Sequence, residues 1–349
     1  MAIDVVGWDI GGAHLKTVAL AGDRIAAVMQ KPCPLWLGLG HFHAAARSIL
    51  DEIKPASDCR HAVTMTGELA DVFANREEGV FGLLEALCAH VPAATIQVFA
   101  GAGGFLPTAQ VQAKDVPAIA SANWLATGYY AATKLEQGLL MDIGSTTTDL
   151  LLVRHGEVLT RGYSDYERLC QGELVYSGVV RTPLMSLARQ APFAGDWIGL
   201  MAEQFATTAD VYRLTGELPA HADQSPAADG GEKTAQASAR RIARMLGRDA
   251  ASSTHEAWQR LGYYFRERQL DALMQACMRQ MSRNCVDGSA PIIGAGVGRF
   301  LVQELADRLG LNYVDFADLY PNAPISAQFA LADCAPALAV ACLLRQAHA

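Results

Sequence analysis

Two short segments of this chain place an aspartate before a glycine-containing turn. One segment begins at Asp9 with the sequence DIGGAH, and the other begins at Asp142 with the sequence DIGSTT. Such a turn leaves backbone N–H groups open to a phosphate, and a carboxylate beside it can hold Mg²⁺. The sequence therefore predicts Mg²⁺ at Asp9 and Asp142. The turn residues predicted to bind phosphate are Gly11, Gly12, Ala13, His14, Gly144, Ser145, Thr146 and Thr147.

The two segments are copies of one pattern, because they match element by element at an offset of 133 residues, from Asp9 to Asp142. In each copy an apolar run leads into the aspartate, and alternating apolar residues follow the turn. This pattern predicts two strands joined by a turn. A single Asp-X-Gly is common in turns, but two at equivalent places indicate paired sites. We expect the two hairpins to face each other and clamp a polyphosphate.

Other polar residues near the predicted strand ends are candidates for the same site. Lys16 lies seven residues after Asp9, on the returning strand of the first hairpin. An exposed lysine is usually only solvated, but this face is expected to look toward the ligand, which favours a phosphate contact. Glu68 has an alternative as a first-turn helix residue, and Arg181 as half of a surface ion pair. The predicted substrate-binding rim consists of Trp36, Glu68, Asn123 and Arg181.

A third glycine-containing segment follows a predicted strand and precedes a predicted helix. It consists of Gly294, Ala295 and Gly296. Glycines at this place let the backbone approach a ligand, and the helix N-terminus favours an anion, so we add these residues to the phosphate site. The spacing does not match the dinucleotide-binding fingerprint, and no Gly-X-X-X-X-Gly-Lys-Ser/Thr motif is present.

The composition is that of a globular chain. Of the 349 residues, 51% are hydrophobic and 18% are charged, and the formal net charge is −8. The length suffices for two domains. A basic stripe with interleaved aromatic residues is missing, so we expect no nucleic-acid partner. The eight scattered cysteines, a start without a signal-peptide pattern and the lack of a long apolar run predict a cytoplasmic protein without membrane contact.

The predicted elements follow an α/β order with a mixed sheet in each half. In the first half we expect strands at 3–9, 16–20, 24–28, 62–65 and 96–100, and helices at 41–53, 68–75, 79–90 and 123–132. The second copy repeats three strands over 138–161. A strand at 173–180 comes next, and a helical insertion at about 182–285 follows it. The insertion is expected to contain helices at 182–189, 197–214 and 255–283 and a mobile loop at 224–231. The sheet resumes at 291–293, with a helix at 299–309 and a strand at 312–315.

These motifs resemble the superfamily of acetate and sugar kinases, heat-shock ATPases and actin. More narrowly, the chain resembles the hydantoinase/oxoprolinase-like proteins linked to one-carbon transfer through tetrahydromethanopterin. The resemblance runs over almost the whole chain, and the segments that carry it are residues 9–16, 65–73, 121–126, 142–149 and 172–176. It implies two duplicated ribonuclease-H-like domains, the second with the helical insertion. The first would span 1–135 together with a C-terminal helix at 330–349, and the second would span 136–329.

The resemblance also implies an activity, which is a transfer step of methanofuran biosynthesis. An aminomethyl-furanmethanol diphosphate would be joined to the phenol oxygen of gamma-glutamyltyramine, with release of pyrophosphate and with Mg²⁺ as cofactor. Asp9 and Lys16 would act on the leaving group, and Asp149 and Glu173 are the candidates for a base. One alternative is an ATP-dependent kinase or hydrolase, with the segment from Gly294 to Gly296 against adenosine. Another, from a different class, is a non-catalytic ATP-binding regulatory protein. Homodimer formation is left open.

Overall fold

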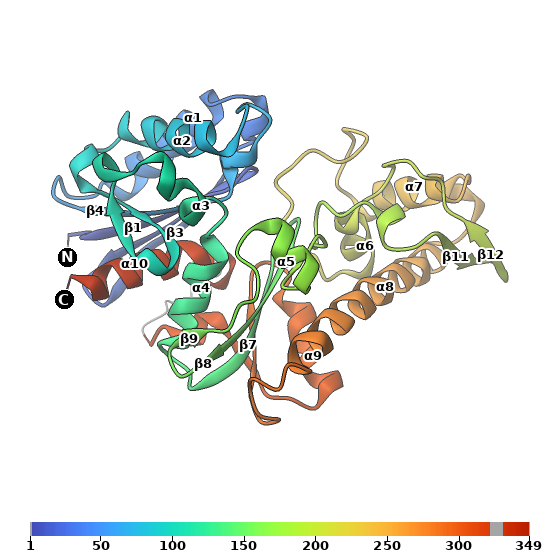
Figure 1. The fold of residues 1–349 in the computed structure, drawn as a ribbon. Helices are drawn as coiled ribbons and strands as arrows, with labels where there is room; N and C mark the ends of the chain where they lie inside the picture. Colours follow the sequence, from blue (N-terminus) through green and yellow to red (C-terminus); the bar gives the residue numbers. More distant parts are fainter. Residues whose placement is uncertain (1, 322–330, 349) are drawn as a thin grey trace. The chain divides into compact units, whose positions relative to one another are not determined.

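A computed structural model describes residues 2–321 and 331–348 of the chain (Figure 1). Contacts within the chain divide it into two compact units. The first unit comprises Met1–Gly138, Leu152–Glu167 and Val314–Ala349, and the second comprises Leu139–Leu151 and Arg168–Tyr313. Each unit is built around a mixed β-sheet.

The sheet of the first unit has six strands in the order β3-β2-β1-β4-β5-β6. β1, β2 and β3 are antiparallel neighbours, β4 and β5 continue parallel to β1, and β6 is antiparallel to β5. The strands are β1 (Val5–Ile10), β2 (His14–Ala21), β3 (Arg24–Pro32), β4 (Arg60–Met65), β5 (Ile96–Phe99) and β6 (Phe105–Pro107). The five strands predicted for this half are confirmed.

Helices cover both faces of this sheet, as Figure 1 shows for α1 and α2 on one side and α10 on the other. Trp8 and Ile10 pack with α1 and α2 in one buried cluster. Gly7 and Asp9 point to the opposite face, because side chains alternate along a strand. A Cβ on Gly7 would lie 1.9 Å from the Ala337 carbonyl oxygen of α10, so only glycine permits this packing. The helices of this unit are α1 (Gly40–Ile53), α2 (Arg76–Cys88), α3 (Val116–Ile119), α4 (Asn123–Ala132) and α10 (Ala335–Ala347).

A second sheet has the order β10-β8-β7-β13-β14, and β9 pairs with β8. Most of it belongs to the second unit, although β9 and the last residues of β8 and β14 are counted with the first. β13 is parallel to β7, and β9 and β10 are antiparallel to β8. The elements are β7 (Gln137–Ile143), β8 (Thr148–Arg154), β9 (Glu157–Val158), α5 (Asp165–Gln171), β10 (Leu174–Val175), β13 (Ile292–Ala295), α9 (Arg299–Leu309) and β14 (Tyr313–Asp315). A hairpin again leads into the sheet, as the duplication predicts.

Between β10 and β13 the chain forms the helical insertion. Its elements are β11 (Gln190–Phe193), β12 (Asp196–Gly199), α6 (Thr208–Thr215), α7 (Ala235–Met245) and α8 (His255–Met281). α8 is continuous and confirms the long helix predicted there. The helix predicted at 197–214 is wrong, because Trp197 pairs with Pro192 across the β11–β12 hairpin. The chain becomes helical only at Thr208.

Three other predicted elements are shorter than expected. The helices predicted at 68–75 and 182–189 are reduced to 3₁₀ turns at Gly67–Leu69 and Leu184–Ser186, and the strand predicted at 173–180 is reduced to β10. In the last case, the Thr148 hydroxyl donates to the Ser177 carbonyl. Beyond Val175, some backbone groups of this segment are thus satisfied by side chains instead of by a neighbouring strand.

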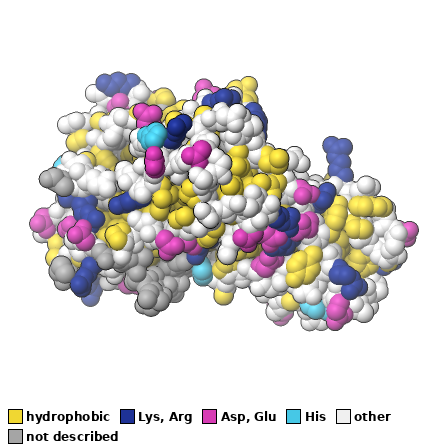
Figure 2. All heavy atoms as spheres, turned by 90° about the horizontal axis from the view of Figure 1, so that it is seen from below, with side chains coloured by type: hydrophobic (Ala, Val, Ile, Leu, Met, Phe, Trp, Pro, Cys, Tyr) yellow, Lys and Arg dark blue, Asp and Glu magenta, His cyan; other side chains and the backbone are white. Residues whose placement is uncertain are grey.

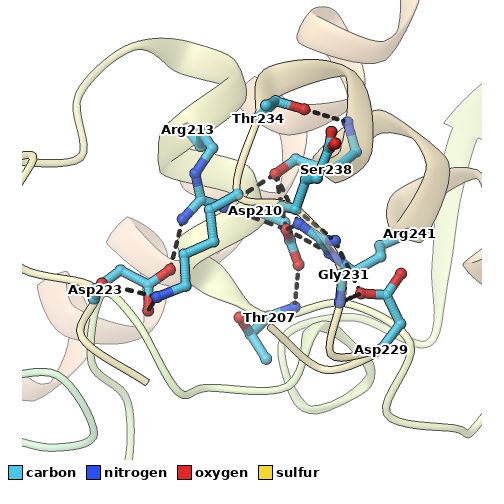
Figure 3. Close-up of polar contacts among 12 residues, drawn as sticks. Thr207, Asp210, Arg213, Asp223, Asp229, Gly231, Thr234, Ser238 and Arg241 are labelled. Atoms are coloured by element: carbon cyan, nitrogen blue, oxygen red, sulfur yellow. Dashed lines mark hydrogen bonds and ion pairs between the residues drawn. The ribbon is translucent and has the colours of Figure 1, made fainter. Parts of the chain in front are cut away.

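A buried ion network joins α6 and α7 (Figure 3). Asp210 of α6 accepts a hydrogen bond from Arg241 of α7 at 2.8 Å, and Arg241 also reaches Asp229 at 3.0 Å. Arg213 forms an ion pair with Asp223. Buried charges are costly unless they are paired, so these contacts fix the connection between the two helices. The loop predicted to be mobile is therefore anchored at both of its ends.

Among the described residues, none of the helices combines the length and the apolar character that crossing a bilayer requires. On the face drawn in Figure 2, Lys and Arg side chains lie close to Asp and Glu side chains.

Candidate functional site

The first half of the candidate site is the β1–β2 hairpin. Asp9 lies one residue before the end of β1, and the Gly11 N–H donates to the His14 carbonyl at 3.0 Å, which closes the turn. Within the described part of the chain, the N–H groups of Gly12 and Ala13 donate to no acceptor. A Cβ placed on Gly12 would also meet open space. The turn therefore presents amides in the way that an anion site requires.

Asp9 belongs to a row of polar side chains that crosses four strands. Gln30, Lys16, Asp9 and Thr64 are neighbours in register on β3, β2, β1 and β4. Because opposite residues share a face and adjacent strands lie about 4.8 Å apart, the four side chains line one face of the sheet. Lys16 is half-buried, and the other three are buried. The sequence analysis missed Gln30 and Thr64, which stand out only once the strands are paired.

This polar row, Gln30–Lys16–Asp9–Thr64, suits a magnesium ion. Carboxylate, amide and hydroxyl oxygens are the ligands that Mg²⁺ takes, usually with water and phosphate completing the shell. Gln30 Oε1 and Thr64 Oγ1 are buried, and no residue of the described chain is their hydrogen-bond partner. A buried oxygen in that condition calls for an ion or a water molecule. Clusters of three or more His, Cys, Asp or Glu suited to a metal do not occur in residues 2–321 and 331–348, so water and phosphate would supply much of the shell.

The start of α4 holds Asp9 from a second side. Asn123 Nδ2 donates to Asp9 Oδ1 at 3.4 Å. Two residues earlier, Ser121 Oγ donates to Glu68 Oε1 at 2.7 Å. Glu68 is 0% exposed, so its predicted position on the rim is wrong. Burial raises the pKa of the Glu68 carboxyl, which favours its neutral form.

The first turn is held in place by the chain that follows β3. The Cys33 N–H donates to the Ala13 carbonyl at 2.8 Å, and the Leu35 N–H donates to the Gly12 carbonyl at 3.0 Å. These bonds occupy the carbonyl groups of the turn and leave its amides to a ligand. Trp36 follows directly and is 38% exposed, which suits its predicted place on the rim.

The second half of the candidate site is the β7–β8 hairpin, which repeats the first turn closely. Asp142 lies one residue before the end of β7, and the Gly144 N–H donates to the Thr147 carbonyl at 2.9 Å. The exposed residue Arg181 is attached beside this turn, because its N–H donates to the Ser145 carbonyl at 2.8 Å. The prediction that the two hairpins face each other stays a prediction.

A segment after β10 covers the second turn, and the helical insertion supports it. A Cβ on Gly178 would lie 2.4 Å from the Thr146 nitrogen, so only glycine fits there. Gln269 of α8 donates to both the Ser177 hydroxyl and the Gly178 carbonyl at 2.9 Å. The Tyr212 hydroxyl of α6 in turn donates to Gln269 Oε1 at 2.6 Å. The sequence gives no signal for this network beyond a glutamine within a long amphipathic helix.

The glycines of the third segment serve the packing of the chain itself. Gly294, Ala295 and Gly296 are all buried. A Cβ on Gly294 would lie 2.6 Å from the Tyr313 ring, and a Cβ on Gly296 would lie 2.4 Å from Asp142 Oδ1. Gly296 also has a φ of +78°, which favours glycine. The packing of the chain itself therefore requires glycine at positions 294 and 296, beside the sheet and Asp142. That these residues meet phosphate stays a prediction.

The two candidate bases are both engaged in ion pairs. Asp149 Oδ1 accepts a hydrogen bond from the buried Arg168 at 2.7 Å. Glu173 is 1% exposed and accepts one from Arg283 at 3.0 Å. A base must reach the proton that it abstracts, and Glu173 does not reach the surface. Its predicted catalytic role is therefore not supported, and Asp149 is better described as the partner of Arg168.

Two mixed sheets, each entered through a hairpin with an aspartate before its turn, define the class of protein with two ribonuclease-H-like domains, as in sugar kinases and actin. The chain is similar to the nucleotide-free structure of acetone carboxylase, from work on ATP-dependent acetone carboxylation, with a TM-score of 0.58. That likeness covers 97% of this chain and 70% of the other at 12% identity, and it concerns the fold alone.

Within this class, the chain belongs to the hydantoinase/oxoprolinase family, whose pattern matches residues 60–336. It is also similar to the (4-{4-[2-(gamma-L-glutamylamino)ethyl]phenoxymethyl}furan-2-yl)methanamine synthase of Methanocaldococcus jannaschii. The two are 30% identical over 249 residues, which are 70% of this chain and 72% of that protein. The protein of the same name from Methanococcus vannielii is 38% identical over 73 residues, which are 21% of this chain and 32% of that one.

Proposed function

We propose that this protein is a transferase of methanofuran biosynthesis that forms an aryl ether. It would join an aminomethyl-furanmethanol diphosphate to the phenol oxygen of gamma-glutamyltyramine and release pyrophosphate. The observation that carries the proposal is the similarity to the M. jannaschii synthase, whose name describes a furan methanamine with a phenoxymethyl group. We place the reaction in the cytoplasm and in the one-carbon metabolism that uses tetrahydromethanopterin.

The chemistry is a displacement at the furan-methyl carbon. The bond from this carbon to the diphosphate oxygen breaks, and its electron pair leaves with pyrophosphate. A new bond forms between the same carbon and the phenol oxygen, whose proton passes to solvent. Because a furan-methyl carbon can bear positive charge, the protein has mainly to orient the two partners and to stabilise the charge on the leaving group.

The residues of the two hairpins suit this task. Asp9 and Asp142 would hold Mg²⁺, with the Thr64 hydroxyl close to Asp9. Bound Mg²⁺ would neutralise charge on the diphosphate oxygens. Lys16 would contact the phosphate from the polar row, and the exposed Arg181 would belong to the substrate-binding rim. Backbone amides of the first turn complete the anion site.

The alternative functions share the same turns but need a nucleotide. An ATP-dependent kinase or hydrolase requires an adenosine site, and the sequence offered only the segment from Gly294 to Gly296 for it. Since these glycines are buried against Tyr313 and Asp142, they lend that alternative little support. A non-catalytic ATP-binding protein would meet the same objection.

The proposal is tested by following both products of the reaction. Purified protein with Mg²⁺ and the two substrates should release one pyrophosphate for each ether that mass spectrometry detects. Asp9→Asn should release pyrophosphate far more slowly while keeping its circular dichroism spectrum. Ether formation only with ATP, or phosphorylation of either substrate, would overturn the proposal in favour of a kinase.

A further inference from the structure

Two loops of the first unit carry apolar side chains that are exposed to solvent. One loop follows β3 and includes Trp36 and Leu37, and the other follows β4 and includes Leu69 and Val72. Trp36 and Val72 are each 38% exposed, Leu69 is 51% exposed and Leu37 is 66% exposed. We call these four side chains the ledge. Large apolar side chains gathered at the surface often mark a binding site.

The ledge adjoins the first phosphate turn. Leu35, one residue before Trp36, donates its N–H to the Gly12 carbonyl of the turn. Gly67, two residues before Leu69, lies so close that a Cβ on it would be 2.5 Å from Leu35 Cδ1 and 3.1 Å from the Ile10 carbonyl oxygen. Both loops therefore begin at the turn and meet each other there.

The exposure of the ledge does not serve the fold. Leu35 is 0% exposed and is part of the core of the first unit, so this residue anchors its loop. Leu37 comes two residues later and contributes no comparable burial. Exposing apolar surface has a free-energy cost of about 25 cal/mol for each Å², and a ligand that covers the surface would recover it.

We propose that the ledge binds the aromatic ring of an arylmethyl diphosphate whose phosphates bind the first turn. This proposal rests on the proposed function and names the part of the site that selects the substrate. In such a molecule one methylene group separates the ring from the diphosphate, so the ring must lie within a few ångströms of the anion site. The two loops that carry the ledge touch this turn at Leu35 and Gly67, one or two residues before their exposed apolar side chains begin.

The test compares two ligands by calorimetric titration in the presence of Mg²⁺. The first ligand is pyrophosphate. The second is a furan-methyl diphosphate analogue in which CH₂ replaces the ester oxygen, so that it has no carbon–oxygen bond to break and cannot release pyrophosphate. The ring should make the analogue bind about tenfold tighter than pyrophosphate to the wild-type protein. The double variant Leu37→Gln with Leu69→Gln should lose this advantage and keep its affinity for pyrophosphate.

A matched control uses two residues of the second unit that are exposed to a similar degree. Leu169 is 47% exposed and Met278 is 57% exposed. The double variant Leu169→Gln with Met278→Gln should keep the tenfold difference. Equal affinity of the wild-type protein for both ligands would overturn the proposal that the ledge binds the ring. The same tenfold difference in affinity in the ledge variant would overturn it too. Failure of pyrophosphate to bind the wild-type protein would instead count against the proposed function.

Discussion

The two hairpins have the same kind of turn but differ at one position of the strand that follows it. Lys16 and Asp149 occupy equivalent positions, since the offset from Asp9 to Asp142 also relates this pair. Lys16 stands next to Asp9 in the polar row, and Asp149 is paired with the buried Arg168. The comparison indicates that one copy places a cation next to the aspartate before its turn and that the other uses the equivalent position for an ion pair within its own unit.

The two turns are also held in place by different parts of the chain. The loop that supports the first turn continues into the exposed ledge. The segment that covers the second turn is held by Gln269 and Tyr212, which the helical insertion supplies. The two copies of one hairpin are thus supported differently, the first by a loop that continues to the surface and the second by buried hydrogen bonds from the helical insertion.

The largest effect is expected at the residues that the copies have in common. Asp9→Asn and Asp142→Asn should each lower kcat by about 10³-fold, because each variant would lose a carboxylate that is proposed to hold Mg²⁺. Steady-state kinetics measure the loss, and melting curves check the fold. Asp9 is only 4% exposed, and a substitution at a buried position can destabilise the fold. The melting curve is therefore the essential control for this variant. Strong destabilisation with normal activity per folded molecule would contradict the assignment.

Substitutions at Lys16 and Asp149, the position at which the copies differ, should affect different properties: ligand binding for Lys16 and stability for Asp149. Asp149→Ala should lower the free energy of unfolding by about 3 kcal/mol, because Arg168 would remain buried without its carboxylate. Lys16→Met should leave stability almost unchanged and weaken binding of pyrophosphate. Urea unfolding and calorimetry separate the two effects. Similar losses of stability in both variants would show that the asymmetry is not real.

A glycine beside each hairpin sharpens the comparison further. Gly296→Ala should destabilise the second unit by about 2 kcal/mol, because the new Cβ would meet backbone and Asp142 and the residue has a positive φ. Gly67→Ala should cost less, since its nearest contact is the flexible Leu35 side chain. Chemical denaturation of both variants provides the measurement, and the reverse order would contradict the structure.

The smallest expected effect is the contribution of Glu68, beside the first hairpin, to the pH dependence of the free energy of unfolding. Burial raises the pKa of Glu68 above its ordinary value of 4.5, so the folded protein keeps a proton that the unfolded chain loses. The free energy of unfolding should therefore fall as the pH rises above 4.5. Glu68→Gln removes this contribution and can still accept the hydrogen bond from Ser121. The variant should gain stability relative to wild type as the pH rises, and parallel pH profiles would rule out the burial effect.

The sequence predicted the fold because local pattern and duplication agreed with each other. The strand pairs around Asp9 and Asp142, α8 and the terminal helix all follow from apolar spacing and turn residues. The predictions failed where long-range contacts decide the environment. Glu68 and Glu173 look like site residues in the sequence, but packing buries their side chains. Gln30 and Thr64 went unnoticed for the converse reason, because their place beside Asp9 depends on strand register.

The central claim is that the hairpins serve a diphosphate and not a nucleotide. Calorimetric titration of the wild-type protein with pyrophosphate and with ATP, each with Mg²⁺, tests it most directly. The first turn has backbone amides that can bind an anion, and Lys16 lies next to Asp9 in the polar row. The space beside Gly294 and Gly296, the glycines suggested for adenosine, is occupied by other residues of the chain. We expect pyrophosphate to bind well and ATP to bind more weakly as an imperfect mimic. Tight binding of ATP without measurable binding of pyrophosphate would contradict the account.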